Sequence, residues 1–565
     1  MAGRTSPILL VISAFVSVLI VVPICFLLFG MFWTSFPGDP QGTLSTEFLV
    51  KVFTGEGVPA HFKTLNLLQN TLIFSSVSST MAVALAFALA WIIHRTNTPG
   101  RRFFDILPLI TFMFPAMLGD IAWTFLLSPN AGLINLYINN PLGLPPFNIY
   151  GMGGMIWAQG LSLTALAYLL ISATFGTMDP TLEEAARISG ARNRQVILKV
   201  TLPLAVPAIV STWTLMLMIG LNSFETPAFI GLPAKVYVFM NAIYHKMSVD
   251  VPIDYGGAAA LSFVSLLLSS VAVAFYLLST RRLKRFAVIT GKGYRPKPID
   301  LGRMKYAALA FLLVYVVVGL ILPVATMALM SFMKFYTVVG VNPLDYLTLK
   351  NYAFVTSEPL MLRSATNSFI LAGVAGVLTT GAAAAMSYVA IRGKMRGKRA
   401  LEFIAALPVA YPGMIFSLAL IWTALLLFRP IYGTMTMLIL AYIVVFLPYG
   451  MRTMANSMIQ IHSELEEVAT VSGASSLTSM RKIMLPLLRP ALINTLMLVF
   501  IQSYRQLGAA ILLVTPSTFV LPVVILHWWA SGLLVALAAA VMIYGVILVA
   551  IVMFARYFLK ASLTF

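Results

Sequence analysis

Three ionisable residues lie within or beside long apolar stretches, where a charge is costly and usually marks a pathway or a buried pair. They are Asp120, Glu225 and Arg505. Two interpretations are open. These side chains line a polar route for a solute, or Arg505 pairs with Asp120 as structural support while Glu225 lies just beyond the membrane. Both concern passage or packing, and we expect no catalytic residue.

Metal chemistry finds little support in the residues that could ligate a metal. The lone cysteine, Cys25, lies in an apolar run, and the histidines show no ligand spacing. The five histidines are His61, His94, His245, His462 and His527. Most of the 30 methionines lie in apolar runs, where a flexible side chain fills gaps. We therefore expect no metal site and no cofactor bound by this chain.

The composition places these residues in a polytopic membrane protein. Of the 565 residues, 60% are hydrophobic and 10% charged, with a mean hydropathy of +0.93. A span of the ~30 Å hydrocarbon core needs about 20 apolar residues and must satisfy its own backbone, which favours helices. The sequence thus predicts an all-α fold with about twelve transmembrane helices. They are expected near 8–32, 70–93, 104–128, 150–175, 205–224, 258–280, 307–332, 367–391, 403–428, 433–451, 490–512 and 533–555.

The net charge of +19 is explained by topology rather than by nucleic-acid binding. The basic residues fall in short clusters between apolar runs, as they do in cytoplasmic loops. Placing the amino terminus inside puts most Lys and Arg residues in the cytoplasm, and the carboxyl terminus then lies inside too. The first apolar run is too long for a typical signal peptide, so we interpret it as a retained helix.

The chain contains an internal repeat. Residues 184–203 match 467–486 at a constant offset of 283, and Asn70 and Pro115 match Asn367 and Pro412 at an offset of 297. Six helices followed by six in the same order indicate a parallel duplication. We predict a first half at 1–280, a cytoplasmic linker at 281–306 and a second half at 307–565.

The repeat is clearest in two charged islands, "EEAARISG" from Glu183 and "EEVATVSG" from Glu466. Glycine inside a short helix costs about 1 kcal/mol against alanine, so the glycine of each island predicts a turn between two short helices. A single island is typical of an amphipathic helix on the membrane surface. Its recurrence with the same spacing favours a shaped surface for a protein partner.

This spacing resembles the EAA signature of binding-protein-dependent ABC importer permeases. The first copy consists of Glu184, Ala185, Ala186, Gly190, Val200, Leu202 and Pro203. The second copy consists of Glu467, Val468, Ala469, Gly473, Ile483, Leu485 and Pro486. Each copy departs from the signature only by one aliphatic exchange, at Val200 and at Val468.

The resemblance implies a fused type I ABC importer permease with two six-helix units, in which each EAA region forms a coupling helix docked on a cytoplasmic ATPase. Glu184 and Glu467 would meet polar or basic groups there, and Gly190 and Gly473 would turn the chain back to the membrane. The linker pair Gly291-Lys292 lacks the other residues of a phosphate-binding loop. ATP and Mg²⁺ would therefore be used by a separate ATPase, in two copies.

The resemblance also implies an exported solute-binding protein as a partner and a multi-pass location, among lipids, in a bacterial inner membrane. The offset of 283 aligns Asn222 with Arg505, and Ser223 with Gln506. Together with Asp120 and Glu225, these residues suggest a polar ring near the outer half of a pathway between the two halves.

The substrate is predicted from short strings. "NSFETPAFIG" and "PPFNIYG" resemble segments of fused permeases for ferric iron, which makes ferric iron the first expectation. Similar fused permeases serve 2-aminoethylphosphonate, thiamine or polyamines, and these stay open. Two other classes also remain: a gradient-driven secondary transporter and a membrane scaffold that transports nothing.

Overall fold

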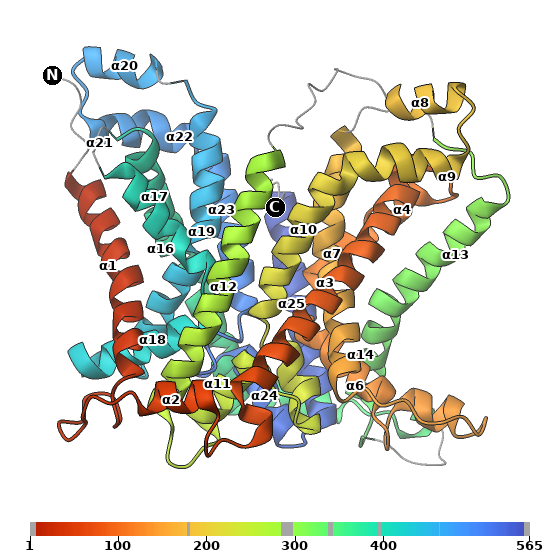
Figure 1. The fold of residues 1–565 in the computed structure, drawn as a ribbon, viewed down its shortest axis with the longest axis horizontal. Helices are drawn as coiled ribbons and strands as arrows, with labels where there is room; N and C mark the ends of the chain where they lie inside the picture. Colours follow the sequence, from red (N-terminus) through yellow and green to blue (C-terminus); the bar gives the residue numbers. More distant parts are fainter. Residues whose placement is uncertain are drawn as a thin grey trace. The chain divides into compact units, whose positions relative to one another are not determined.

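The chain folds almost entirely into helices (Figure 1). The structure is a computed structural model, and it describes residues 7–177, 181–283, 298–336, 343–393, 397–462 and 464–558. Over these ranges extended pairing is limited to three isolated β-bridges. The predicted all-α polytopic fold is confirmed. Most of the predicted linker, 281–306, lies outside the described residues.

Nine helices of the described ranges are long and apolar enough to cross a membrane, and eleven if each of two sharply bent pairs is one span. The nine are α1 (Pro7–Gly30), α3 (Thr64–Arg95), α7 (Met152–Thr177), α10 (Leu202–Leu221) with the preceding η3 (Ile197–Thr201), α12 (Tyr255–Leu283), α13 (Met304–Val316) joined through η7 (Val317–Ile321) to α14 (Leu322–Phe332), α16 (Pro359–Ile391), α19 (Met435–Ile459) and α25 (Leu534–Phe558).

The third span of each half is not the continuous helix that the sequence predicts. Range 104–128 forms α4 (Arg101–Phe104), α5 (Leu107–Met113) and α6 (Ala116–Leu127), and 403–428 forms α17 (Lys398–Ala406), η9 (Leu407–Val409) and α18 (Gly413–Leu427). The second set bends by 109°. Both breaks fall at a proline, Pro115 and Pro412, with extended ψ values of 137° and 145°. Proline lacks the N–H that a helix needs and restricts the residue before it.

The chain divides into two compact units. Unit 1 comprises Met1–Val58, Ala242–Leu267 and Leu349–Phe565, and unit 2 comprises Pro59–Asn241 and Leu268–Thr348. Helix α1 opens the chain, yet in unit 1 it packs against α16, α17 and α18. In unit 2, α14 packs against α6, and α13 against α3 and α7. The packing thus does not follow the two sequence halves, whose boundaries remain a prediction about the duplication.

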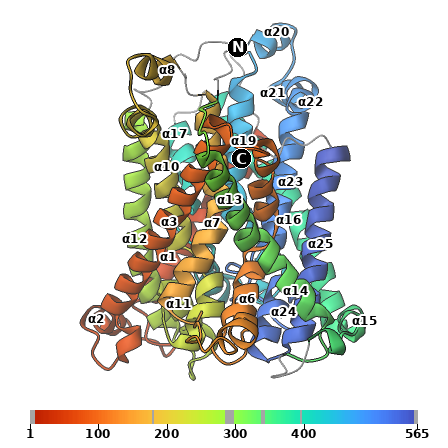
Figure 2. The ribbon, with the colours of Figure 1, turned by 90° about the vertical axis from the view of Figure 1, so that its right-hand side faces the viewer.

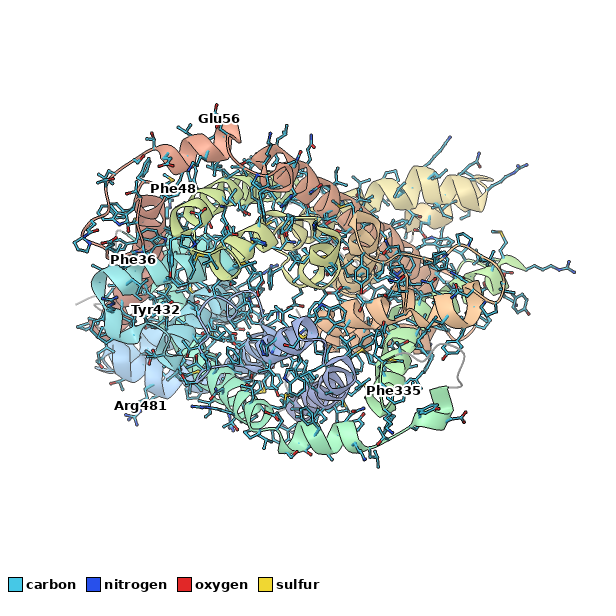
Figure 3. All side chains as sticks on the ribbon, turned by 90° about the horizontal axis from the view of Figure 1, so that it is seen from below. Phe36, Phe48, Glu56, Phe335, Tyr432 and Arg481 are labelled. Carbon is cyan, nitrogen blue, oxygen red and sulfur yellow. The ribbon has the colours of Figure 1, made fainter. Side chains whose placement is uncertain are left out.

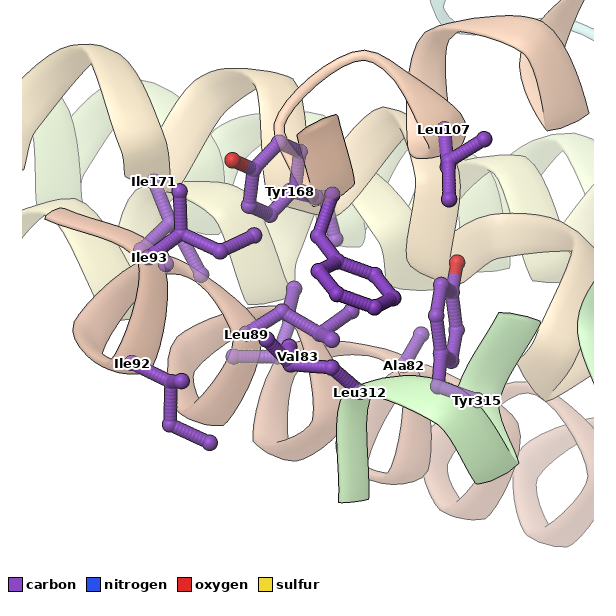
Figure 4. Packing of buried hydrophobic residues seen from close by; sticks show 14 of the residues in the cluster. Ala82, Val83, Leu89, Ile92, Ile93, Leu107, Tyr168, Ile171, Leu312 and Tyr315 are labelled. Carbon is purple, nitrogen blue, oxygen red and sulfur yellow. The ribbon is translucent and has the colours of Figure 1, made fainter. Parts of the chain in front are cut away.

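The main core of unit 2 forms where α3, α5, α7 and α13 meet (Figure 4). Leu89 and Ile93 of α3 pack with Tyr168 and Ile171 of α7, and Leu312 of α13 completes the cluster. All five side chains are buried. Because interiors are close-packed and resist deformation, α3 and α7 form a stiff pair in this unit.

Each unit carries two short helices beyond one end of its long helices (Figures 1 and 2). They are α8 (Thr181–Ile188) and α9 (Asn193–Val196) in unit 2, and α20 (Glu464–Val471) and α21 (Ser476–Ser479) in unit 1. A π-helical turn follows in both units, η3 in unit 2 and η11 (Met480–Met484) in unit 1. The chain then enters α10 without a sharp bend, whereas the segment formed by η11 and α22 (Leu485–Leu487) meets α23 (Arg489–Arg505) at 66°.

The other short helices lie mostly in the connections. They are α2 (Glu47–Thr54), η1 (Ala60–Phe62), η2 (Asn135–Asn139), η4 (Pro227–Gly231), η5 (Leu232–Ala234), α11 (Phe239–Ser248), η8 (Pro343–Tyr346), α15 (Lys350–Ser357), η10 (Arg429–Ile431) and α24 (Leu521–Ala530). We call the connection from Leu221 to Phe239 in unit 2 and that from Arg505 to Leu521 in unit 1 the outer segments. Their residues include five of the six predicted pathway residues, all except Asp120.

Candidate functional site

Gly190 and Gly473 end α8 and α20 in the same left-handed conformation, with φ values of +85° and +82°. In the first copy, the amide N–H of Ala191 donates to the carbonyl of Ala186 at 3.0 Å, and the equivalent pair of the second copy is 2.9 Å apart. This is the six-to-one bond of a Schellman cap, whose left-handed position glycine adopts without a Cβ penalty. The glycine of each island therefore forms the turn that its spacing predicts.

The second short helix of each island is capped at its start, by different residues in the two copies. In unit 2 the side-chain oxygen of Gln195 accepts the amide N–H of Arg192 at 2.9 Å. In unit 1 the hydroxyl of Ser475 accepts the amide N–H of Thr478 at 3.2 Å. A capping box combines both of these hydrogen bonds, and each copy makes one of them. The two copies thus cap the same helix start with different residues.

One face of α8 and one face of α20 are held against the protein. Glu183 of α8 is only 3% exposed and accepts a hydrogen bond from the hydroxyl of Thr201 at 2.8 Å. Thr201 closes η3, so this bond ties α8 to the start of the next membrane helix. In unit 1 the position of Thr201 is taken by Met484, which is also buried, and Ala469 faces inward. The first copy is thus anchored by a polar contact where the second offers an apolar side chain.

The other face of α8 and of α20 carries exposed apolar side chains. Ile188 is 87% exposed and Val471, its equivalent in the second copy, 90% exposed. Leu182 and Leu465 form a second equivalent pair, and both are exposed. Residues six apart lie about 120° apart around a helix, and the exposed Ala185 and Val468 lie between them, so each pair borders one broad exposed side, which we call the apolar ridge. Exposed apolar side chains of this kind usually mark a protein contact.

The remaining predicted coupling residues lie around this ridge and at the start of the next helix. Ala185 is exposed and Glu184 half-buried, while Glu467 is exposed on α20. Pro203 and Pro486 are the second residues of α10 and α22, just after the π-helical turns η3 and η11, and neither can donate a backbone N–H to the preceding turn. The half-buried Leu202 and Leu485 precede them. Nearby in unit 1, the exposed Arg481 extends away from the helices (Figure 3).

Asp120 lies at the centre of a buried polar cluster in unit 2. Its side chain is 2% exposed, and both carboxylate oxygens lie 3.0 Å from the hydroxyl of Thr226. That hydroxyl is also 2.9 Å from the amide oxygen of Gln159, which accepts the hydroxyl of Ser223 at 3.0 Å. Asp120 and Ser223, both predicted, are thus joined through two residues that the sequence analysis does not single out.

The equivalent place in unit 1 has the same construction but no carboxylate. Ser417, at the position of Asp120, donates its hydroxyl to the carbonyl of Ala509 at 2.6 Å, and Ala509 takes the position of Thr226. The hydroxyl of Tyr442 donates to the backbone carbonyl of Gln506 at 3.1 Å. The predicted equivalence of the segments around Ser223 and Gln506 therefore agrees with their contacts, and the acid is confined to unit 2.

The other predicted pathway residues lie beside these clusters. Asn222 accepts the hydroxyl of Ser269 through its side-chain oxygen at 3.2 Å. Glu225 is half-buried in the outer segment of unit 2, and Arg505 is half-buried as the last residue of α23. The pairing of Arg505 with Asp120 stays a prediction. Among the described residues, no group of three His, Cys, Asp or Glu side chains is arranged to hold a metal ion.

Gln159 and Thr226 are the residues that sequence reasoning missed. Both are polar in otherwise apolar surroundings, and Thr226 lies inside "GLNSFETPAFIG", so polarity within a span was an available signal. Thr226 and Asp120 are 106 residues apart, and no local pattern relates them. The contact depends on the packing of α6, α7 and the outer segment.

A helical membrane chain with two Schellman turns at repeats of the EAA type has the architecture of an ABC importer permease. A family model described as "Binding-protein-dependent transport system inner membrane component" matches residues 378–563. "Putative ABC transporter permease protein ORF1" of Streptomyces antibioticus is 30% identical over 183 residues, which cover 32% of this chain and 79% of that protein. The chain belongs to the binding-protein-dependent ABC transporter permeases.

Two further relatives differ in the solute that they are named for. "Ferric transport system permease protein FbpB" of Actinobacillus pleuropneumoniae is 28% identical over 528 residues, covering 90% of this chain and 72% of that protein. "Putative 2-aminoethylphosphonate transport system permease protein PhnU" of Salmonella choleraesuis (strain SC-B67) is 28% identical over 218 residues, covering 38% of this chain and 75% of that protein. The chain is thus similar to the first over most of its length and to the second over part of it.

Proposed function

We propose that this chain is the membrane subunit of an ATP-driven importer and that α8 and α20 are its coupling helices. The observation that carries this proposal is the duplicated apolar ridge formed by Leu182 and Ile188 and by Leu465 and Val471. An aliphatic side chain about nine-tenths exposed has no stabilising role in a free chain. Two such ridges on equivalent helices fit two copies of one partner surface.

The partner surface is a groove on a separate ATPase, which uses ATP and Mg²⁺. Docking removes the ridge from water, and the apolar area that is buried stabilises the complex by about 25 cal/mol per Å². A displacement of the docked helix then reaches the membrane through the Schellman turn and the following π-helix. In unit 2 the bond between Glu183 and Thr201 provides a second, direct route to the start of α10.

Further proposals follow from this assignment. The chain spans a bacterial inner membrane, with the coupling helices and both termini in the cytoplasm. A solute-binding protein docks at the opposite, outer end of the chain. The solute passes along a route that includes the polar cluster of Asp120 and Ser223. Ferric iron is the proposed solute, supported by a ferric permease that is similar over 90% of this chain. The competing solute is 2-aminoethylphosphonate, for which the shorter similarity is the support.

The test of coupling is a pair of charge substitutions on the ridges. Ile188→Asp and Val471→Asp place a carboxylate where the ATPase groove is apolar, and desolvating an unpaired charge is costly. We expect both variants to insert in the membrane and to lose the ATPase during affinity purification in mild detergent. Leu142→Asp and Leu44→Asp, which alter exposed leucines far from the islands in sequence, serve as matched controls.

Two results would contradict the proposal. One is that no ATPase accompanies the wild-type chain from its native host, and the other is that both ridge variants retain it. A gradient-driven transporter would instead take up solute without any ATPase and stop when a protonophore collapses the proton gradient. The solute is tested separately, by measuring whether the partner binding protein retains ferric iron or 2-aminoethylphosphonate.

A further inference from the structure

One helix in each unit, α3 in unit 2 and α16 in unit 1, is joined by side-chain hydrogen bonds to the chain at both of its ends. At the inner end, Arg95 closes α3 and donates from Nη2 to the carbonyl of Phe175 at 3.4 Å. Its guanidinium also lies 5.7 Å from the centre of the Phe175 ring. Phe175 is in the last turn of α7, the helix that precedes α8 in the sequence.

The same contact recurs in unit 1 at the duplicated position. Arg392 follows the last residue of α16 and donates from Nη2 to the carbonyl of Met458 at 3.0 Å, and also to the carbonyl of Ile461. Met458 is in the last turn of α19, and Ile461 belongs to the connection that leads to α20. A guanidinium suits this place because the final carbonyls of a helix lack intrahelical donors and carry the negative end of the macrodipole.

At its other end each helix binds the outer segment of its unit. Asn70 of α3 donates from Nδ2 to the carbonyl of Tyr237 at 3.0 Å, and the hydroxyl of Thr71 accepts the amide N–H of Phe239 at 3.2 Å. Both contacted residues lie where the outer segment of unit 2 ends and α11 begins. The bonds thus fix the end of the segment that carries Ser223 and Glu225.

Unit 1 repeats this outer contact as well. Asn367 of α16 donates from Nδ2 to the carbonyls of Phe519 and Ser517, at 2.9 and 3.2 Å. The hydroxyl of Ser368 accepts the amide N–H of Leu521 at 2.7 Å. Both units therefore combine an asparagine that donates to a backbone carbonyl with a hydroxyl that accepts a backbone N–H, through two bonds in unit 2 and three in unit 1.

The spacing between the two ends is the same in both helices. Asn70 and Arg95 are separated by 25 residues, as are Asn367 and Arg392. At 1.5 Å per residue the bonds lie about 38 Å apart along the helix, more than the ~30 Å hydrocarbon core. Neither helix contains a proline between these residues, so an axial push is not absorbed by a kink.

We infer that α3 and α16 are struts that carry a displacement of the coupling helix to the outer segment of the same unit, with Arg95, Arg392, Asn70 and Asn367 as positioning residues. The inference rests on the proposed function, because the displacement begins with ATP-dependent movement of α8 and α20. When the coupling helix moves, the end of α7 or α19 moves with it. The arginine transmits this displacement to α3 or α16, and the asparagine at the other end transmits it to the outer segment.

The test is amide hydrogen exchange on the assembled complex of this chain with its ATPase, without nucleotide and with ATP trapped by vanadate. In the wild type we expect ATP to change exchange in the outer segments of both units. Arg95→Ala should abolish the change in residues 221–239 and leave it intact in 505–521, and Arg392→Ala should do the reverse. Arg95→Lys should restore part of the response, since an ammonium can still donate to one carbonyl.

A second pair of variants separates the two ends of the strut. Asn70→Leu and Asn367→Leu keep the side-chain size and remove the donor, so exchange near the coupling helix should still respond to ATP while the outer segment of that unit does not. Arg102→Ala and Arg399→Ala are the matched controls, because both arginines are exposed near the same helix ends. They should leave every response unchanged.

The outcomes distinguish the strut from the proposed function. If the wild-type complex forms and both outer segments respond, but Arg95→Ala and Asn70→Leu leave the response of residues 221–239 unaltered, the strut is refuted and the coupling proposal stands. If the wild-type complex forms and ATP changes neither outer segment, the strut is refuted and the coupling proposal stands; if no ATPase binds, both proposals fail. A variant that lowers all responses in both units alike has lost its fold. In that case Arg95→Lys, Asn70→Leu and Asn367→Leu decide whether the strut exists.

Discussion

The Schellman glycines give the most direct test of the coupling turns. A residue with a side chain pays about 1–2 kcal/mol in the left-handed region, and Gly190 and Gly473 have φ values near +85°. A Cβ added at either position would meet nothing within 4 Å. The expected cost of alanine is therefore the backbone penalty alone, with no steric contribution.

The size of the effect follows from this penalty. A cost of 1–2 kcal/mol reduces the population of the native turn relative to its alternatives by a factor of about 5–30. The two glycines lie in separate compact units, so Gly190→Ala and Gly473→Ala together should cost about twice as much as either alone. Asparagine tolerates the left-handed region better than alanine, so Gly190→Asn should be the milder change.

The assay measures the amount of ATPase retained by the purified chain and the ATPase activity of the complex. We expect both to fall for Gly190→Ala and further for the double variant, while insertion in the membrane is unchanged. Gly143 and Gly532 provide matched controls in units 2 and 1, since each has a positive φ and open space around its Cβ position. If Gly143→Ala lowers coupling as much as Gly190→Ala does, the role assigned to the turn is wrong.

Three further predictions concern other parts of the chain. Thr226→Val removes the hydroxyl beside the buried carboxyl of Asp120, and we expect a loss of about 1–3 kcal/mol, seen as a lower unfolding temperature in detergent. Gly450→Val should cost about 1–3 kcal/mol by overpacking, because even a Cβ would come within 2.8 Å of an alanine on α16. The backbone N–H of Gly302 and the side chain of Asn97 donate to Asp300 and hold the pKa of its carboxyl below the usual value. These hydrogen bonds should therefore be intact at neutral pH and weaken as the pH falls through that lowered pKa. Hydrogen exchange at 299–301 measures the last effect.

Two of these predictions have a control variant, and the third has a result that would contradict it. Gly373→Val changes a helical glycine of unit 1 with nothing within 4 Å, and it should leave the unfolding temperature unaltered. Asp300→Asn should remove the pH dependence of protection, which is the exchange rate divided into the intrinsic rate at the same pH, since the side-chain amide does not titrate in that range. A pH-dependent protection that survives in this variant would assign the effect to another group. An unfolding temperature unchanged by Thr226→Val would mean that the hydroxyl contributes nothing to the buried cluster.

Several features could be predicted because they depend on local sequence. Hydropathy alone identifies a span, since about 20 apolar residues reach across the hydrocarbon core. The offset of 283 between the islands identifies equivalent turns. Each turn needs a positive φ, which favours glycine at that position. The breaks at Pro115 and Pro412 were also encoded locally. They were missed because hydropathy does not register the missing N–H of a proline.

The remainder depends on which helices come together. No sequence pattern relates Asp120 to Thr226 across 106 residues, or Arg95 to Phe175 across 80, because side-chain bonds of this kind form only after the helices have packed. The same holds for α1, which packs in unit 1 with helices encoded more than 300 residues later. By itself the sequence determined the membrane class, the duplication and the two glycine turns, since these follow from local hydropathy and backbone geometry. Only the tertiary structure decided the compact units, the buried cluster and the two-ended bonding of α3 and α16, since apolar helices of similar hydropathy do not specify their neighbours.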